Sequence, residues 1–148
     1  MSIPRTPERL PDVATTTATD TTKADTMKFL ALIYDPEGTN DFAPDSPEFE
    51  AYMGQWLALD AALKEAGVYV GGEALQPSTT ATRVRVRGGK QETMDGPFAE
   101  TKEQLGGYYV LDCKNLDEAI KYAAMIPVHE TGTIEVRPLI DLSEMTDA

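Results

Sequence analysis

The sequence predicts one domain of the α+β class, built from two strand–helix–strand units with a β-hairpin between them. A continuous apolar run from Met27 is followed by a long amphipathic stretch, and this order recurs in the second half of the chain. Between the two units, "TRVRVR" alternates strictly and leads into a double glycine. With 148 residues, 41% hydrophobic and 26% charged, the chain is long enough to bury one core.

The first unit begins with "MKFLALIYDPEG", which is typical of a buried strand that ends at Asp35-Pro36. A helix is expected from Ser46, which can cap it, with Pro47 in its first position and Gly67 at its end. Its apolar residues recur at steps of three and four: Phe49, Tyr52, Met53, Trp56, Leu59, Leu63 and Ala66. "VYVGGEAL", residues 68–75, then predicts a second strand that lies parallel and next to the first.

The middle of the chain predicts a hairpin. Alternation in "TRVRVR" puts Val84 and Val86 on one face and three arginines on the other. Gly88-Gly89 can supply the positive φ angles of a two-residue turn, after which "KQETM" forms the return strand. This register places Arg85 opposite Glu92, as a solvated pair or as part of a site for an anion.

The second unit starts with the strand "YYVLDC", preceded by "ETKEQ" as an exposed helical turn over residues 100–104. Asn115 and Glu118 form a capping-box pattern, so a helix is expected to begin there and to stop at Pro127. The apolar face of this helix comprises Leu116, Ala119, Ile120, Ala123 and Ile126. "TIEVRPLI" closes the domain as its last strand.

Without the hairpin, the order of elements is βαββαβ, which is the ferredoxin-like arrangement of two helices on one face of an antiparallel sheet. The strands carry apolar residues on both faces, so the face without helices also needs a cover. A homodimer that packs sheet against sheet supplies one, because two-fold symmetry lets one patch cover itself. The expected core residues are Leu30, Leu32, Val84, Val86, Val110, Leu111, Ile134 and Val136.

Composition narrows the possible partners. A net charge of −12 and a pI near 4.4 disfavour nucleic acid and anionic membrane surfaces as partners. One cysteine and one histidine, Cys113 and His129, supply neither a disulfide nor a usual zinc site, and we expect no metal and no cofactor. We expect a cytoplasmic protein with a disordered tail over residues 1–26, a domain over 27–141 and a flexible end over 142–148.

Several stretches together resemble the YCII-related family, in its DGPF-domain branch: "MKFLALIYDPEG", "AGVYVGGEALQPSTTATRVR", "DGPFAETKEQLGGYYVLDC", "LDEAIKYAAMIP" and "GTIEVRP". The resemblance implies a bacterial, dimeric ferredoxin-like α/β-barrel protein without an established biochemical function, sometimes encoded beside or fused to extracytoplasmic-function sigma factors. Plainer YCII proteins have a suspected catalytic dyad of a histidine on the first helix and an aspartate near the end of the second. Here the first helix has no histidine, so the dyad is not carried over.

The stretch "DGPFAETKEQLGGYY", residues 95–109, contains the densest set of candidate site residues. Asp95-Gly96-Pro97 reads as a turn, and Asp95 is either a hydrogen-bonded corner or a ligand contact and general base, with Glu100 close by. Gly106-Gly107 is either a β-bulge or a place where a ligand meets bare backbone. We predict that the turn is a structural corner that also forms one wall of a small-molecule site.

Three further candidates lie outside this stretch. Glu73 ends a strand just after two glycines, where a carboxylate faces a cleft or a buried partner. His129 can shuttle protons near neutral pH or be merely exposed, and Arg85 can hold an anion. Two functions remain open: a cofactor-free acid–base enzyme that acts on a small organic molecule, and a non-catalytic dimeric module that binds a metabolite or a regulatory partner, such as a sigma factor.

Overall fold

The computed structural model describes residues 25–38 and 42–143. Residues 1–24 of the predicted tail and residues 144–148 of the predicted C-terminal end therefore fall outside the described residues. No helix in the two described ranges combines the length and the apolar character needed to cross a membrane. In chain order the elements are β1 (Met27–Pro36), α2 (Pro47–Glu65), β2 (Tyr69–Ala74), the 3-10 helix η3 (Ser78–Thr80), β3 (Thr82–Arg87), β4 (Lys90–Asp95), β5 (Glu103–Cys113), α3 (Leu116–Ala123) and β6 (Thr133–Pro138).

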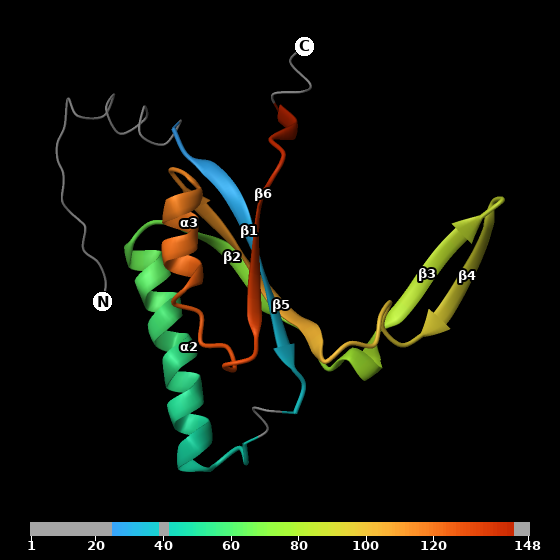
Figure 1. The fold of residues 1–148 in the computed structure, drawn as a ribbon, viewed down its shortest axis with the longest axis horizontal. Helices are drawn as coiled ribbons and strands as arrows, with labels where there is room; N and C mark the ends of the chain where they lie inside the picture. The colour runs from blue at the N-terminus through green and yellow to red at the C-terminus, as the bar shows by residue number, and fades with distance from the viewer. Residues whose placement is uncertain (1–24, 39–41, 144–148) are drawn as a thin grey trace.

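The main sheet has four strands in the order β2-β5-β1-β6, and every neighbouring pair is antiparallel. Both helices lie on one side of this sheet (Figure 1). This confirms the predicted α+β class and is consistent with the ferredoxin-like arrangement. The expectation that β2 lies beside β1 was wrong, because the crossover through α2 skips one strand position and β5 fills it.

Both helices begin as their capping residues predict. The side chain of Ser46 accepts a hydrogen bond from the amide of Phe49 at 3.1 Å, and Pro47 opens α2. The side chain of Asn115 accepts from the amide of Glu118 at 2.9 Å, and the Glu118 carboxylate accepts in return from the amide of Lys114. Helix α3 ends at Ala123, before the predicted stop at Pro127, because the chain tightens there into 3-10 type turns.

The hydrophobic core lies between the helices and the sheet. On β1 the alternate residues Phe29, Ala31 and Ile33 are buried, and they meet Leu59 and Leu63 of α2. Among the predicted core residues, Leu111 is buried, and Ile134 and Val136 pack against the core from β6. The remaining three on the sheet, Leu30, Leu32 and Val110, are half-buried because the strand alternation puts them on the face without helices.

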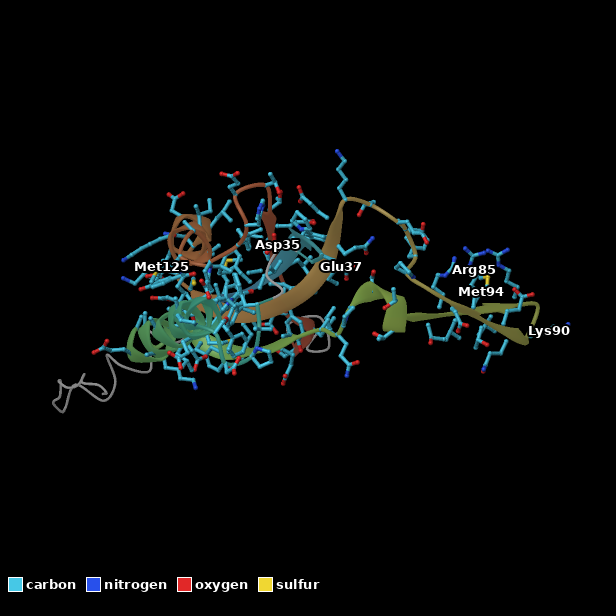
Figure 2. All side chains as sticks on the ribbon, turned by 90° about the horizontal axis from the view of Figure 1, so that it is seen from below. Asp35, Glu37, Arg85, Lys90, Met94 and Met125 are labelled. Carbon is cyan, nitrogen blue, oxygen red and sulfur yellow. The ribbon has the colours of Figure 1, made fainter. Side chains whose placement is uncertain are left out.

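Strands β3 and β4 form a separate two-stranded sheet, which we call the arm (residues 82–95). The arm projects away from the main sheet (Figures 1 and 2). Gly88 and Gly89, with φ of 58° and 78°, form its two-residue turn, and Arg85 pairs with Glu92, as predicted. The placement of Val84 and Val86 in the core was wrong: within this chain they are 60% and 66% exposed, because the arm packs on no other layer.

Strand β5 is longer than the sequence indicates. It begins at Glu103, where "ETKEQ" predicts a helical turn, and that prediction was wrong. Pairing with the end of β1 makes this segment extended, since Glu103 pairs with Pro36 and Gln104 with Asp35. The register of this pair shifts from Ile33↔Gly107 to Tyr34↔Leu105. Gly106 is therefore the extra residue of a β-bulge, one of its two predicted roles.

Candidate ligand-binding cavity

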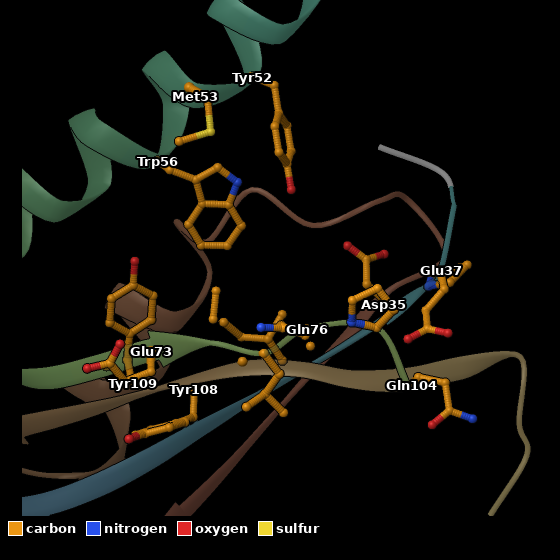
Figure 3. A pocket seen from close by; sticks show the side chains of 18 of the residues that line it. Asp35, Glu37, Tyr52, Met53, Trp56, Glu73, Gln76, Gln104, Tyr108 and Tyr109 are labelled. Atoms are coloured by element: carbon orange, nitrogen blue, oxygen red, sulfur yellow. The ribbon is translucent and has the colours of Figure 1, made fainter. Parts of the chain in front are cut away.

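A cavity of about 760 Å³ lies between the first half of α2 and the sheet. Helix α2 contributes Tyr52, Met53, Trp56 and Asp60 to the lining. Tyr52 and Trp56 point toward the strands, and Tyr109 points toward them from β5 (Figure 3). The ends of β1 and β2 and the chain that follows each strand complete the lining. This volume lies within the range of about 300–1,000 Å³ that is usual for small-molecule sites.

Glycines on the strands beneath α2 leave room for the cavity, because they have no side chain to fill the space between the strands and the helix. Gly72 lies opposite Tyr109, and Gly107 lies opposite Ala74, in the pairing of β2 with β5. A Cβ on Gly72 would come within 2.7 Å of the Tyr108 carbonyl oxygen, and one on Gly107 within 2.9 Å of the Glu73 carbonyl oxygen. The two strands thus approach closely, and their bare backbone forms part of the cavity lining.

Aromatic side chains form the cavity wall nearest the core. The rings of Trp56 and Tyr109 lie 6.4 Å apart between centroids and are nearly parallel, at 20°. Tyr52 meets Trp56 edge-on at 6.2 Å, and Tyr69 meets Tyr109 edge-on at 6.2 Å. Burial, and then the negative charge of Asp60, raise the pKa of the Tyr109 hydroxyl, which therefore stays protonated at neutral pH.

Four carboxylates line the cavity: Asp35, Glu37, Asp60 and Glu73. Two of them accept hydrogen bonds from main-chain amides. Both oxygens of Asp35 lie 3.3 Å from the amide nitrogen of His129. Glu37 accepts from the amide and the hydroxyl of Ser78, each at 2.7 Å. These contacts fix the chain around the cavity.

The third carboxylate, Asp60, is paired with Lys64 one helical turn away, at 2.8 Å. The same ammonium group lies over the ring of Tyr69, 5.1 Å from its centroid. Asp60 raises the pKa of Lys64, first through their hydrogen bond and then through its charge. Lys64 itself is not among the residues that line the cavity, and the part of the lining that the structure describes contains no lysine, arginine or histidine.

Of the site residues expected from the sequence, Glu73, Gly106 and Gly107 line the cavity. Arg85 lies far along the arm (Figure 2). Asp95 and Glu100 are exposed and also lie outside the cavity. The expectation that the "DGPF" turn forms a wall of the site is therefore not met by this cavity. The turn leaves the sheet at the base of the arm, whereas the cavity lies beneath α2.

The corner at Asp95 is held by main-chain groups rather than by the predicted carboxylate contacts. The amide of Gly96 donates to the carbonyl of Ala81 at 2.8 Å, and the carbonyl of Asp95 accepts from Arg83 at 3.2 Å. Gly96 has the predicted positive φ, at 94°. The Asp95 carboxylate has no hydrogen-bond partner within the described residues.

His129 contributes its backbone, and not its ring, to the neighbourhood of the cavity. Its amide donates to Asp35, while its Nδ1 lies 2.8 Å from the Thr131 hydroxyl and accepts a hydrogen bond from the Thr131 amide. The His129 ring is not part of the cavity lining, and neither is Asp95. The structure therefore does not bring the three predicted catalytic residues, Glu73, Asp95 and His129, together in this cavity. Across the described ranges, no three His, Cys, Asp or Glu side chains lie close enough to hold a metal ion.

The sequence reasoning missed most of the cavity. Asp35 was seen only as a strand end, and Tyr52, Met53 and Trp56 only as the apolar face of a helix. Leu59 and Leu63 are the buried residues of α2, so its apolar face covers the sheet only in its second half. The sequence contains one signal of this cavity: the aromatic residues Tyr52 and Trp56 and the paired glycines Gly71-Gly72 occur in the same strand–helix–strand unit.

Fold and cavity together define an α+β protein with a small-molecule-sized site between a helix and a four-stranded antiparallel sheet. The chain belongs to the YCII-related family, whose domain matches residues 27–143. It is also similar to an uncharacterised protein of Rhizobium meliloti (strain 1021), with 40% identity over 115 residues, which cover 76% of this chain and 92% of the relative.

Proposed function

We propose that this protein binds a small organic molecule in the cavity beneath α2 and acts as a binding module. The observation that carries the proposal is the cavity itself, of about 760 Å³, whose lining combines aromatic rings, bare strand backbone and acidic residues. Apolar walls with a few polar groups are the usual composition of a ligand site.

Binding fits this geometry better than acid–base catalysis. Asp35 and Glu37 accept hydrogen bonds from main-chain amides, and Asp60 is paired with Lys64. An acid–base pair needs two titratable groups whose environments separate their pKa values. Glu73 is the lining carboxylate without a hydrogen-bond partner in the described chain, and the His129 ring lies outside the cavity, so no such pair is assembled.

Trp56 offers a direct test, because it is the sole tryptophan of the chain and it lines the cavity. We would screen a fragment library for compounds that change Trp56 fluorescence and confirm hits by calorimetry. Met53→Arg should abolish binding by filling the cavity, since Met53 lines it. Leu57→Arg is the matched control: Leu57 lies on the same helix, is 66% exposed and is not part of the lining.

If no fragment binds, or if Met53→Arg and Leu57→Arg bind equally well, the proposal of a ligand in this cavity is wrong. If a bound fragment is chemically converted and Glu73→Gln stops the conversion, the protein is an enzyme and the binding-module assignment is wrong. Mass spectrometry of each hit after incubation with the protein distinguishes these outcomes.

We also propose that the protein functions as a homodimer. Leu30 pairs with Val110 and Leu32 with Tyr108 on the face of the sheet without helices, and Val84 and Val86 of the arm are more than half exposed. The arm has four cationic and two acidic side chains in a chain of net charge −12. A second copy therefore offers an acidic surface to the arm as well as an apolar face to the sheet.

The test of the dimer is the mass in solution. Sedimentation or light scattering should give twice the chain mass of 16.1 kDa at micromolar concentration. Leu32→Asp should yield a folded monomer, because it places a charge in the middle of the expected interface, whereas the exposed substitution Glu65→Gln should leave the mass unchanged. A monomeric parent protein at this concentration would contradict the proposal.

A further inference from the structure

The charges around the cavity are strongly one-sided. Among the described residues, its lining includes four acidic residues and no lysine, arginine or histidine, although the chain contains 13 lysines and arginines. Three of the carboxylates, Asp35, Glu37 and Glu73, form no ion pair with any described residue. The hydrogen bonds that Asp35 and Glu37 accept come from uncharged amides and a hydroxyl, so their charge is not neutralised.

Carboxylates alone do not define a ligand, but this cavity adds a second feature. Tyr52, Trp56, Tyr69 and Tyr109 surround the space between α2 and the sheet. The face of an aromatic ring carries partial negative charge and attracts cations, and tryptophan does so most strongly. Aromatic faces and carboxylates thus favour the same sign of charge in one cavity.

The protein already uses this chemistry at the margin of the cavity. The ammonium of Lys64 is held between the carboxylate of Asp60, at 2.8 Å, and the ring of Tyr69, at 5.1 Å from the centroid. Both Asp60 and Tyr69 line the cavity, whereas Lys64 does not. An alkylammonium group therefore has the right size and charge for the Asp60–Tyr69 corner, and Asp35 and Glu37 offer further positions for a ligand cation.

We infer that the ligand of this cavity is an organic cation, a protonated amine or a quaternary ammonium compound with an apolar or aromatic body. The inference rests on the proposed binding function and adds the chemical class of the ligand. The apolar body of such a molecule packs against Trp56 and Met53, and its positive group faces the carboxylates. An anionic ligand would meet uncompensated negative charge and find no cationic side chain in the lining.

Three probes on one molecular frame test this directly: 2-phenylethylamine, which is protonated at neutral pH, the uncharged 2-phenylethanol, and the anion phenylacetate. Each is titrated against the full chain at low ionic strength, with Trp56 fluorescence and calorimetry as readouts. We expect the amine to bind at least roughly tenfold more tightly than the alcohol, through cation–π and screened charge attraction, and the anion most weakly.

Carboxylate-to-amide variants separate charge from shape. Glu37→Gln keeps a carbonyl oxygen for the Ser78 amide and an NH₂ group for the Ser78 hydroxyl, so the local structure is retained, and Asp35→Asn keeps an oxygen that can accept from the His129 amide. Each should weaken binding of the amine several-fold and leave binding of the alcohol unchanged. Glu65→Gln is the matched control, since Glu65 is exposed on α2 and lies outside the cavity lining.

The outcomes distinguish this inference from the function on which it rests. If the alcohol or the anion binds as tightly as the amine, and Met53→Arg abolishes that binding, the cavity is a ligand site but the cationic class is wrong. If the Glu37→Gln and Asp35→Asn variants bind the amine as the parent does, the inference is also wrong. If none of the three probes binds but an uncharged or anionic fragment from the library does, the inference is wrong and the binding function stands; if no probe and no fragment binds, both are wrong.

Discussion

Glu37 holds Ser78 with both of its carboxylate oxygens, one on the amide and one on the hydroxyl, each at 2.7 Å, although 41 positions separate the two residues in the sequence. The contact ties the turn after β1 to the first residue of η3. Glu37 and Pro77, the neighbour of Ser78, both line the cavity. The hydrogen bonds between Glu37 and Ser78 therefore fix the distance between two segments of the cavity lining.

Removing this tie should cost stability. Glu37→Ala should lower the free energy of unfolding by about 0.5–1.5 kcal/mol, because both hydrogen bonds are lost, and Glu37→Gln should recover most of the loss. Urea unfolding measures the difference. Glu65→Ala, an exposed change on α2, should alter stability much less; an equal loss in Glu65→Ala and Glu37→Ala would contradict the prediction.

The glycines beneath α2 should differ sharply in their tolerance of a side chain. Gly107→Ala should destabilise the protein by about 1–3 kcal/mol, because its Cβ would lie 2.9 Å from a backbone carbonyl oxygen. Gly106→Ala is the matched control, since its Cβ would meet nothing closer than 3.9 Å. Thermal and urea unfolding of both variants provide the comparison. A similar loss at the two positions would show that strand packing does not set the requirement.

The buried thiol of Cys113 should make the stability of the protein depend on pH in the alkaline range. Burial, followed by the charges of Glu118 and Asp112, raises the pKa of its thiol from 9.0 to about 11. Between these two values the thiol ionises in the unfolded chain but stays protonated in the folded one, so raising the pH favours unfolding. The stabilisation is complete below pH 9.0 and is lost as the pH rises to about 11.

Urea unfolding at several pH values should therefore show stability falling over this range. Cys113→Ala should flatten the pH profile without abolishing it, because the raised pKa of Tyr109 acts in the same direction. The thiol of the parent protein should also resist alkylation at neutral pH until the chain is unfolded. Identical pH profiles for the parent and the variant would contradict the role of Cys113.

A glycine should be required at position 96 because of its positive φ angle, and not because a side chain there would collide with neighbouring atoms. Its φ is 94°, and an added Cβ would meet no atom within 4 Å. Gly96→Ala should therefore cost about 1–2 kcal/mol from backbone strain alone, and Gly96→Asn less, because asparagine tolerates positive φ better than alanine. Chemical denaturation tests the order of the two variants. Equal losses in Ala and Asn would indicate a different cause.

Local signals predicted most of the fold. Ser46 and Asn115 mark the helix starts, Gly88-Gly89 marks the hairpin, and alternation along β1 separates its two faces. The position of β2 was not available from such signals, because periodicity does not say which strands become neighbours. The start of β5 was missed for the same reason: pairing of Gln104 with Asp35 overrides the helical character of "ETKEQ".

The candidate site was much less predictable than the fold. A polar stretch such as residues 95–100 draws attention in a sequence, yet the arm carries it away from the cavity. The cavity depends on strand register: Gly72 lies opposite Tyr109 and Gly107 lies opposite Ala74, so few side chains fill the space beneath the first half of α2. An apolar helix face looks the same in sequence whether a core or a cavity lies beneath it.

The arm also affects how the protein behaves in concentrated solution. As a two-stranded sheet it exposes two strand edges, and such edges invite pairing with other chains and the growth of aggregates. Arg83, Arg85 and Arg87 alternate along β3, and Lys90 opens β4. When two arms approach edge to edge, these cations repel one another and disfavour strand pairing between the arms. The arm therefore remains free to contact a surface of opposite charge.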